Sequence, residues 1–147
     1  MRPYFRHFML LGILLWLVLP GGSGPARASG LVLEANKGRQ GEPFEVQQAV
    51  ARGKYTLVDF WSPHCPPCMK IAPFLEKLAA KRPDLRVVKL NIDRPGSRGI
   101  DWRSPLAQQY QLRSIPYMVI FDPQGRQIAQ GQGAFDLFLK WLKEAGL

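Results

Sequence analysis

Two cysteines three positions apart, at the junction between a strand-like and a helix-like stretch, constrain this chain more than any other feature. Cys65 and Cys68 are the only cysteines in the 147-residue sequence. Residues 56–61 form a short apolar run with β-branched and aromatic side chains, which predicts a strand buried on both faces, as in a parallel sheet. Beyond the cysteines, apolar residues recur with helical spacing at Ile71, Phe74, Leu75, Leu78 and Ala79. The pair is therefore predicted at the start of a helix that follows a buried strand.

The close spacing of the pair indicates reactivity rather than a structural role. A disulfide that closes so short a loop removes little chain entropy from the unfolded state, so it stabilises a fold only slightly. One such pair supplies two metal ligands, whereas a closed zinc site needs four, and His64 is the only histidine beyond the first 28 residues. Metal or cluster binding would need a second chain or external ligands. We therefore expect no metal site and no cofactor.

Thiol–disulfide exchange needs one thiolate that attacks and a second thiol that resolves the mixed disulfide. The start of a helix favours negative charge, and motifs of this kind lower the pKa of the first cysteine from about 8.5 to about 3.5–7.5. Cys65 is predicted to be the exposed nucleophile and Cys68 the buried resolving thiol. His64 either stabilises the thiolate when it is protonated or is an exposed loop residue. Pro66 and Pro67 remove two backbone donors beside the sulfur, which argues against a strongly oxidising pair.

The N-terminal region has the pattern of a secretory signal peptide. A basic start is followed by an apolar run over residues 8–19 and by small residues that end in Ala26-Arg27-Ala28. We predict a signal peptide over residues 1–28 with cleavage after Ala28, which would make the protein periplasmic or otherwise extracytoplasmic. The alternative is a retained membrane anchor, although about 12 apolar residues make only about 18 Å of helix against a hydrocarbon core of about 30 Å.

The rest of the chain predicts an α/β domain over residues 42–147, preceded by a lead-in segment over 29–41 with a short strand at 31–33. Helices are expected over 42–54, from Cys65 to about residue 83, and over 106–112, and a final amphipathic helix is marked by Phe135, Phe138, Leu139 and Leu142. Strands are expected at 56–61, 85–92, 117–121 and 126–129, with a loop at 93–105 and a turn at 122–125. This order predicts a mixed central sheet with helices on both faces and a C-terminal antiparallel hairpin.

The charge balance limits the classes of partner. The chain has 20 Lys and Arg against 11 Asp and Glu. Three of the basic residues lie in the predicted leader, so 17 basic and 11 acidic residues remain, a net charge of +6. Such a charge favours solubility and weak attraction to anionic surfaces. The basic residues are scattered rather than gathered in a run, so nucleic-acid binding is not expected.

Several motifs that follow one another in the chain resemble those of thioredoxins. They are Val58-Asp-Phe-Trp61, Cys65-Pro-Pro-Cys68, Ile71-Ala72-Pro73, Lys89-Leu-Asn-Ile-Asp93, Tyr110-Gln-Leu-Arg-Ser-Ile-Pro116 and Gly131-Gln-Gly133. The resemblance runs from Glu42 to the C-terminus and implies the three-layer thioredoxin-like fold. The Pro-Pro pair resembles that of exported, membrane-associated reductases of the cytochrome c maturation type. Residues 97–105 look like an insertion, and His64 stands where the family commonly has tryptophan, so the substrate rather than the reaction is in question.

The resemblance implies a role for each residue around the cysteines. Cys65 would be the nucleophile, Cys68 the resolving thiol, and Asp59 a buried carboxylate that helps to move the proton on or off Cys68. Pro116 would be a cis-proline beside the cysteines, and Ile115 would offer its backbone to an extended substrate.

Asp59, Trp61 and Pro116 also stand out from the residues alone. Asp59 is the one charge in an apolar buried strand, where a lone carboxylate is costly without a function or a partner. The alternative for Asp59 is a simple ion pair with Lys89 from the neighbouring strand. Trp61 belongs either to the core or to the substrate-binding surface around the site. Pro116 heads a strand-like run, where proline is tolerated only at an edge or at the first residue.

These features predict a thiol–disulfide oxidoreductase that acts on exported proteins by dithiol exchange, in the reductive direction, as a monomer. A reductant in an oxidising compartment needs a dedicated donor, and a membrane electron donor is expected. The alternatives are an oxidant that inserts disulfides and a binding module of thioredoxin fold in which the cysteines do not react.

Overall fold

The computed structural model describes residues 32–147. The predicted signal peptide, the site of its cleavage and the first residues of the lead-in segment lie outside this part of the chain. Within it, no helix combines the length and the apolar character that a membrane crossing requires.

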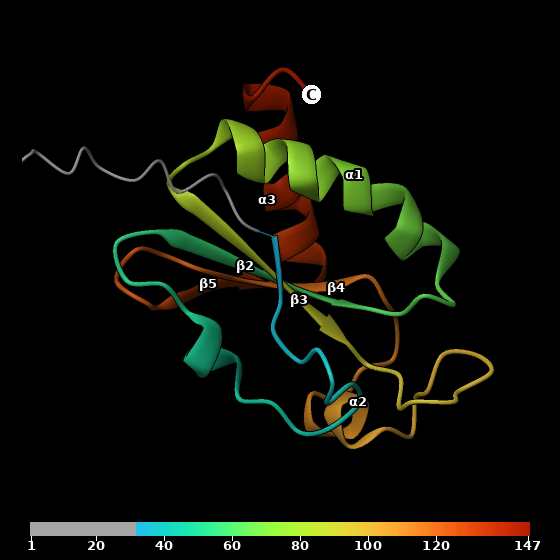
Figure 1. Ribbon diagram of the computed structural model, residues 1–147. Helices are drawn as coiled ribbons and strands as arrows, with labels where there is room; N and C mark the ends of the chain where they lie inside the picture. Colours follow the sequence, from blue (N-terminus) through green and yellow to red (C-terminus); the bar gives the residue numbers. More distant parts are fainter. Residues whose placement is uncertain (1–31) are drawn as a thin grey trace, which may run out of the picture.

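The centre of the molecule is a five-stranded mixed sheet with the strand order β1-β3-β2-β4-β5 (Figure 1). Its strands are β1 (Val32–Glu34), β2 (Tyr55–Trp61), β3 (Leu85–Asn91), β4 (Tyr117–Phe121) and β5 (Gln127–Gln130). Strands β1, β2 and β3 are parallel, whereas β4 runs antiparallel to β2 and forms a hairpin with β5. The predicted mixed sheet with its C-terminal antiparallel hairpin is therefore confirmed, and the short strand expected near residue 31 forms one edge.

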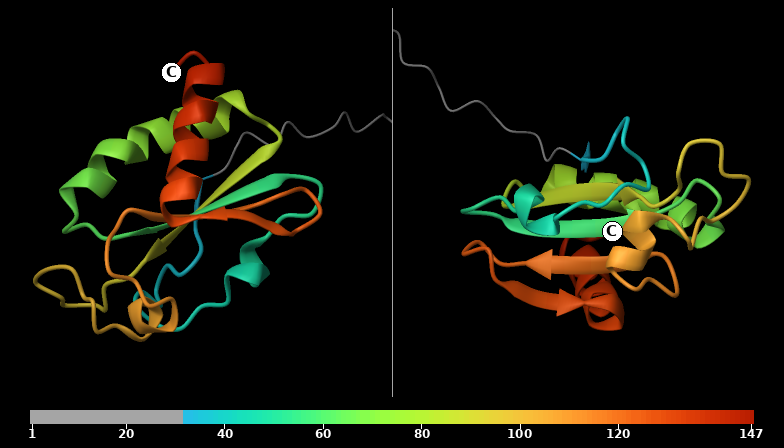
Figure 2. Two further views of the ribbon diagram at one scale, coloured as in Figure 1. Left: turned by 180° about the vertical axis from the view of Figure 1, so that it is seen from behind. Right: turned by 90° about the horizontal axis from the view of Figure 1, so that it is seen from below.

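Helices cover both faces of the sheet, as the order of the elements predicts. Helices α1 (Pro66–Lys81) and α3 (Gly131–Glu144) lie together on one face, and the short helix α2 (Pro105–Gln109) lies on the other (Figures 1 and 2). Each face buries its own apolar core. Alternate residues of β2 enter the two cores, since Leu57 faces α1 and α3 while Val58 and Phe60 face α2. The architecture is thus three-layered, with β2 in its middle.

Helix α1 begins immediately after Cys65, which is its N-cap residue, and Pro66 and Pro67 occupy its first two positions. Proline is tolerated there because the first amides of a helix have no intrahelical partner. Leu75, Leu78 and Ala79 are buried against the sheet, as the helical spacing predicts. Phe74 is 41% exposed, so its predicted place in the buried stripe is wrong.

The predicted helix over residues 42–54 does not form. Only a four-residue 3₁₀ turn is present, at Val46–Ala49. Long-range hydrogen bonds engage the backbone of this segment instead: the amide of Phe44 donates to Oε1 of Gln109, and the amide of Val46 donates to the hydroxyl of Tyr110. The same hydroxyl donates to the carbonyl oxygen of Phe44 at 2.8 Å. Side chains at the C-terminal end of α2 thus satisfy backbone groups that a longer helix would have paired internally.

Gly41 joins the lead-in segment to the rest of the fold. Its amide donates to the carbonyl of Asn91, and its carbonyl accepts from the amide of Leu106. Its φ of +74° is one that residues with a Cβ rarely adopt, and a Cβ here would lie 2.8 Å from the backbone nitrogen of Arg94. Glycine is therefore required at this position by both conformation and space.

We predict that Gly41→Ala lowers the free energy of unfolding by about 3 kcal/mol, because the clash with Arg94 adds to the cost of a left-handed backbone. The matched control is Gly38→Ala, since Gly38 has a φ of +83° and no heavy atom lies within 4 Å of the position that its Cβ would take. That control should lose only about 1 kcal/mol. Urea denaturation of both variants measures the difference, and equal losses would show that the contact with Arg94 is unimportant.

Candidate active site

Cys65 and Cys68 form a disulfide at the N-terminal end of α1, with their Cα atoms 5.3 Å apart. Cys65 caps the helix: its Sγ accepts a hydrogen bond from the amide of Cys68 at 3.2 Å. Because Pro66 and Pro67 have no amide hydrogen, this is the first backbone donor that α1 offers. The predicted position of the pair at a helix start is confirmed. The same amide and the helix dipole would stabilise a thiolate on Cys65 once the disulfide is reduced.

The predicted exposure of Cys65 is wrong for this disulfide form. Both cysteines are only 2% exposed. The Sγ of Cys65 is bonded to Cys68 on one side and lies 3.7 Å from the carbonyl oxygen of Ile115 on another. Residue Ile115 is fifty positions away in the sequence, so this cover comes from tertiary structure.

The segment that covers Cys65 contains the predicted cis-proline. The peptide bond between Ile115 and Pro116 is cis, which confirms the expectation for Pro116. Both residues are half-buried and line a shallow groove of about 410 Å³, whose other walls include Tyr117, Gln132 and Phe135. Ile115 therefore contacts the disulfide through its carbonyl oxygen and also lines a groove whose other side is formed by the start of α3.

Asp59 lies in the middle of β2, on the face covered by α1. Its partner in β4 is Met118, which belongs to the core beneath α1 and α3. The carboxyl group is 1% exposed, and neither oxygen accepts a hydrogen bond. Burial raises the pKa of Asp59 from its ordinary 3.8 to about 7, while the charge of Lys89 opposes that rise in part. The structure thus holds a carboxyl group that exchanges a proton near neutral pH on the side of the sheet that carries Cys68.

Lys89 does not form the ion pair with Asp59 that the alternative interpretation required. The two residues are register partners in β2 and β3. However, the ammonium nitrogen of Lys89 lies 3.8 Å from the centre of the Trp61 ring, a cation–π contact. Asp59 consequently remains a buried carboxyl group without a partner.

Trp61 is half-buried at the end of β2, and its indole nitrogen is buried without a hydrogen-bond partner. Among residues 32–147, the buried side-chain polar atoms that lack a partner are this nitrogen and the two oxygens of Asp59. Unpaired buried polar groups are rare in folded proteins. Their concentration in the second half of β2, directly before the cysteines, makes this region part of the candidate site.

The turn between β2 and Cys65 is held by a buried hydrogen bond that the sequence did not reveal. The hydroxyl of Ser62 donates to Oδ2 of Asp93 at 2.6 Å and accepts from the amide of His64 at 2.9 Å. The carbonyl of Ser62 accepts from the amide of Cys65 at 3.1 Å. Ser62 and Asp93 follow the neighbouring parallel strands β2 and β3 closely, and this shared position is the signal that would have found the pair.

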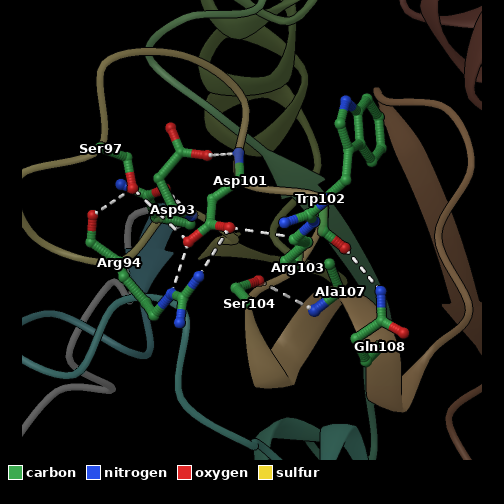
Figure 3. Close-up of polar contacts among 10 residues, drawn as sticks. Asp93, Arg94, Ser97, Asp101, Trp102, Arg103, Ser104, Ala107 and Gln108 are labelled. Carbon is green, nitrogen blue, oxygen red and sulfur yellow. Dashed lines mark hydrogen bonds and ion pairs between the residues drawn. The ribbon is translucent and has the colours of Figure 1, made fainter.

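Asp93 also begins the loop over residues 93–104, between β3 and α2, which holds most of the predicted insertion at 97–105 and is called the insertion loop from here on (Figure 3). Its Oδ1 accepts from the amide of Asp101 at 2.8 Å, and Asp101 forms a two-point ion pair with Arg94 at 2.6 and 3.1 Å. The exposed ring of His64 lies with Nε2 3.1 Å from the carbonyl oxygen of Ser97. Of the two interpretations of His64, the structure favours a loop residue that contacts the insertion.

The described part of the chain contains no cluster of three or more His, Cys, Asp or Glu side chains that could hold a metal ion. The fold and the site together define a class: proteins of thioredoxin fold with a Cys-X-X-Cys pair at the start of a helix and a cis-proline beside it. The family model described as Thioredoxin matches residues 40–144. The chain belongs to the thioredoxin family.

Individual relatives agree with this assignment. The chain is 41% identical over 69 residues to "Thioredoxin" of Mycolicibacterium smegmatis, a match that covers 46% of this chain and 56% of the relative. It is 31% identical over 90 residues to "Thioredoxin-1" of Saccharomyces cerevisiae, which covers 61% of this chain and 79% of the relative. The crystal structure of spinach chloroplast thioredoxin f, short form, superposes with a TM-score of 0.54 at 25% identity, over 81% of this chain and 96% of that one.

The raised pKa of Asp59 predicts a pH-dependent stability. Because the native carboxyl group holds its proton up to about pH 7 whereas the unfolded one loses it near 3.8, stability should fall as pH rises between these values and level off above. Asp59→Asn removes the charge, so the variant should match the wild type at pH 4 and exceed it by about 3 kcal/mol at pH 8.

Denaturation at both pH values, with the disulfide intact, tests this expectation. Asp136→Asn serves as the control, because it replaces an exposed carboxylate on α3 and should show no such divergence. A constant difference between Asp59→Asn and the wild type from pH 4 to pH 8 would contradict the assigned pKa.

Proposed function

We propose that this protein is a thiol–disulfide oxidoreductase that reduces disulfides of exported proteins through Cys65 and Cys68. The observation that carries the proposal is the placement of the pair, with the amide of Cys68 directed at the sulfur of Cys65 at the start of α1. Family membership supports the reaction type. The M. smegmatis alignment spans only about half of that relative's length, so the activity of this chain is inferred from its own site.

The first step is attack by the Cys65 thiolate on one sulfur of a client disulfide. A bond forms between Cys65 and the client, the client disulfide breaks, and the departing client thiolate takes a proton from solvent. The amide of Cys68 and the dipole of α1 stabilise the attacking thiolate. The groove beside Ile115 and Pro116 would receive the client backbone, with Trp61 at the edge of the site.

The second step releases the reduced client. Cys68 gives its proton to the carboxylate of Asp59, and the resulting thiolate attacks the sulfur of Cys65 in the mixed disulfide. The Cys65–Cys68 disulfide forms, and the second client sulfur leaves as a thiolate that is then protonated. In total the client gains two electrons and two protons, which the dithiol loses. A pKa of about 7 suits Asp59 to this transfer at neutral pH.

The reductive direction and the exported location rest on sequence features. The two prolines leave α1 with fewer donors to the sulfur than a chain with ordinary residues there would have, which favours a less oxidising pair. The N-terminal pattern of a signal peptide supports an oxidising compartment, where a membrane electron donor would return the disulfide to the dithiol.

A second candidate function is a binding module in which the cysteines do not react. The burial of Cys65 in the disulfide form is the observation that favours it. In that case the groove beside Pro116 would hold a client without exchange, and replacing Cys65 would leave client binding intact.

A trapping experiment distinguishes the two functions. Cys68→Ser should accumulate clients as mixed disulfides on Cys65, because the resolving thiol is absent and release stalls. Cys65→Ser is the matched control and should trap nothing and lose all reductase activity. Mass spectrometry of the trapped species identifies the clients. Equal recovery of covalent adducts from both variants, or none from either, would count against the exchange mechanism.

The reduction potential decides the direction. We predict a value near about −270 mV, typical of a reductant, rather than about −120 mV, typical of an oxidant. Equilibration of the protein with defined ratios of reduced and oxidised thiol buffer, followed by alkylation of free thiols, measures it. A value at the oxidising end would reverse the proposed direction while preserving the exchange chemistry.

A further inference from the structure

The insertion loop lies against the turn that carries Cys65. The ring of His64, the residue before Cys65, contacts the carbonyl oxygen of Ser97 at 3.1 Å. The loop projects beside the N-terminal end of α1 (Figure 2). Arg98 follows Ser97 directly, and its side chain is exposed. The loop therefore carries an exposed arginine directly after the residue that contacts His64.

Two further exposed cations lie two residues in sequence from groups at the disulfide. The carbonyl of Ile115 contacts the sulfur of Cys65 at 3.7 Å, and Arg113 precedes it by two residues. Lys70 lies two residues beyond Cys68 in the first turns of α1. Each of the three segments that meet at the disulfide thus carries an exposed cation within two residues of a group at the cysteine turn.

The acidic residues of the insertion loop do not neutralise these cations. Asp101 is engaged by Arg94 in the two-point ion pair at the base of the loop (Figure 3). Asp93 is 4% exposed and accepts from Ser62 and from the amide of Asp101. Both carboxylates therefore hold the loop in shape, and neither is available to neutralise the exposed cations.

We define the basic rim as Lys70, Arg98 and Arg113, all of them exposed. Within the described residues, none of the three forms an ion pair. Segments 62–70, 94–103 and 111–117 contain no acid other than the paired Asp101. On the α3 side of the groove, Asp136 accepts a hydrogen bond from Gln132. The three segments accordingly carry an excess of positive charge.

We propose that the basic rim selects client proteins whose target disulfide is flanked by acidic residues. The inference rests on the proposed oxidoreductase function and adds its substrate class. Charge complementarity raises the rate of encounter and suppresses partners of like charge. The unpaired guanidinium groups of Arg98 and Arg113 are suited to client carboxylates, because a guanidinium matches a carboxylate with two parallel donors.

The test compares two disulfide-bonded peptides that differ only beside their cysteines, one with two Asp and the other with two Asn on each side. For the wild type in about 10 mM salt, we expect kcat/KM for the acidic peptide to exceed that for the neutral peptide about tenfold, since each surface pair contributes a factor of about three. In about 1 M salt, where the Debye length is about 3 Å, the ratio should approach one.

The variant Arg98→Gln/Arg113→Gln should lower the low-salt ratio to about threefold or less. The control variant Arg86→Gln/Lys143→Gln removes the same charge from exposed positions on β3 and at the far end of α3, and its ratio should stay near tenfold. An equal fall in both variants would show that net charge rather than the rim is responsible, and it would overturn the proposal.

The remaining outcomes separate the two proposals. If the wild type reduces both peptides at equal rates in low salt, the basic rim proposal fails while the oxidoreductase function stands. If it reduces neither peptide in the dithiol form, the oxidoreductase function fails and the basic rim proposal fails with it.

A second experiment measures binding to vesicles of phosphatidylcholine and phosphatidylserine. Loss of that binding in Arg98→Gln/Arg113→Gln, with a peptide ratio of one in the wild type, would assign the rim to a membrane surface and overturn the client proposal.

Discussion

Strand β2 has hydrogen-bonded neighbours on both edges and side-chain layers on both faces, and this confinement sets the direction in which the chain leaves the sheet at Ser62. Pairing with β3 and β4 fixes the strand along its whole length, so the alternation of successive side chains between the two faces decides which of them face α1. Asp59 falls on that side together with Leu57. The turn after Trp61 then places Cys65 at the start of α1. The position of Asp59 relative to the sulfur of Cys65 therefore depends on the sheet rather than on the loop.

The site combines two opposite electrostatic environments over a few residues. At Cys65, the amide of Cys68 and the end of α1 favour negative charge on the sulfur. At Asp59, burial without a hydrogen bond disfavours the charged form and raises the pKa to about 7. The first environment would favour the charged form of the sulfur after reduction, whereas the second favours the neutral form of the carboxyl group. If stability alone mattered, an apolar residue would be better than Asp59, because burying a carboxyl group without a hydrogen bond destabilises the folded state.

Local sequence patterns predicted the helices and strands whose formation depends on neighbouring residues in the chain. The apolar run at 56–61, the helical spacing after Cys68 and the hairpin around residue 122 are all confirmed. Failures arose where distant partners decide the outcome. The helix expected over 42–54 is absent because Tyr110 and Gln109, more than sixty positions away, hold its backbone. Cys65 is buried because the carbonyl of Ile115 covers it. The bond between Ser62 and Asp93 joins two strand ends whose adjacency appears only when the sheet is assembled.

The insertion loop is closed at its base by Arg94 and Asp101, and its first residue is fixed to the cysteine turn through Ser62. Residues 95–100, between the two members of that ion pair, make no contribution to either buried core apart from the half-buried Ile100. The ion pair at the base therefore holds the two ends of the loop in place, whatever the sequence of the residues between them. Homologous loops of other lengths and charges could be grafted between these two residues while Asp93 keeps its bonds to Ser62 and Asp101, and only the contact of Ser97 with His64 would be exchanged. Client preference and electron-transfer chemistry would then diversify independently in descendants of this scaffold.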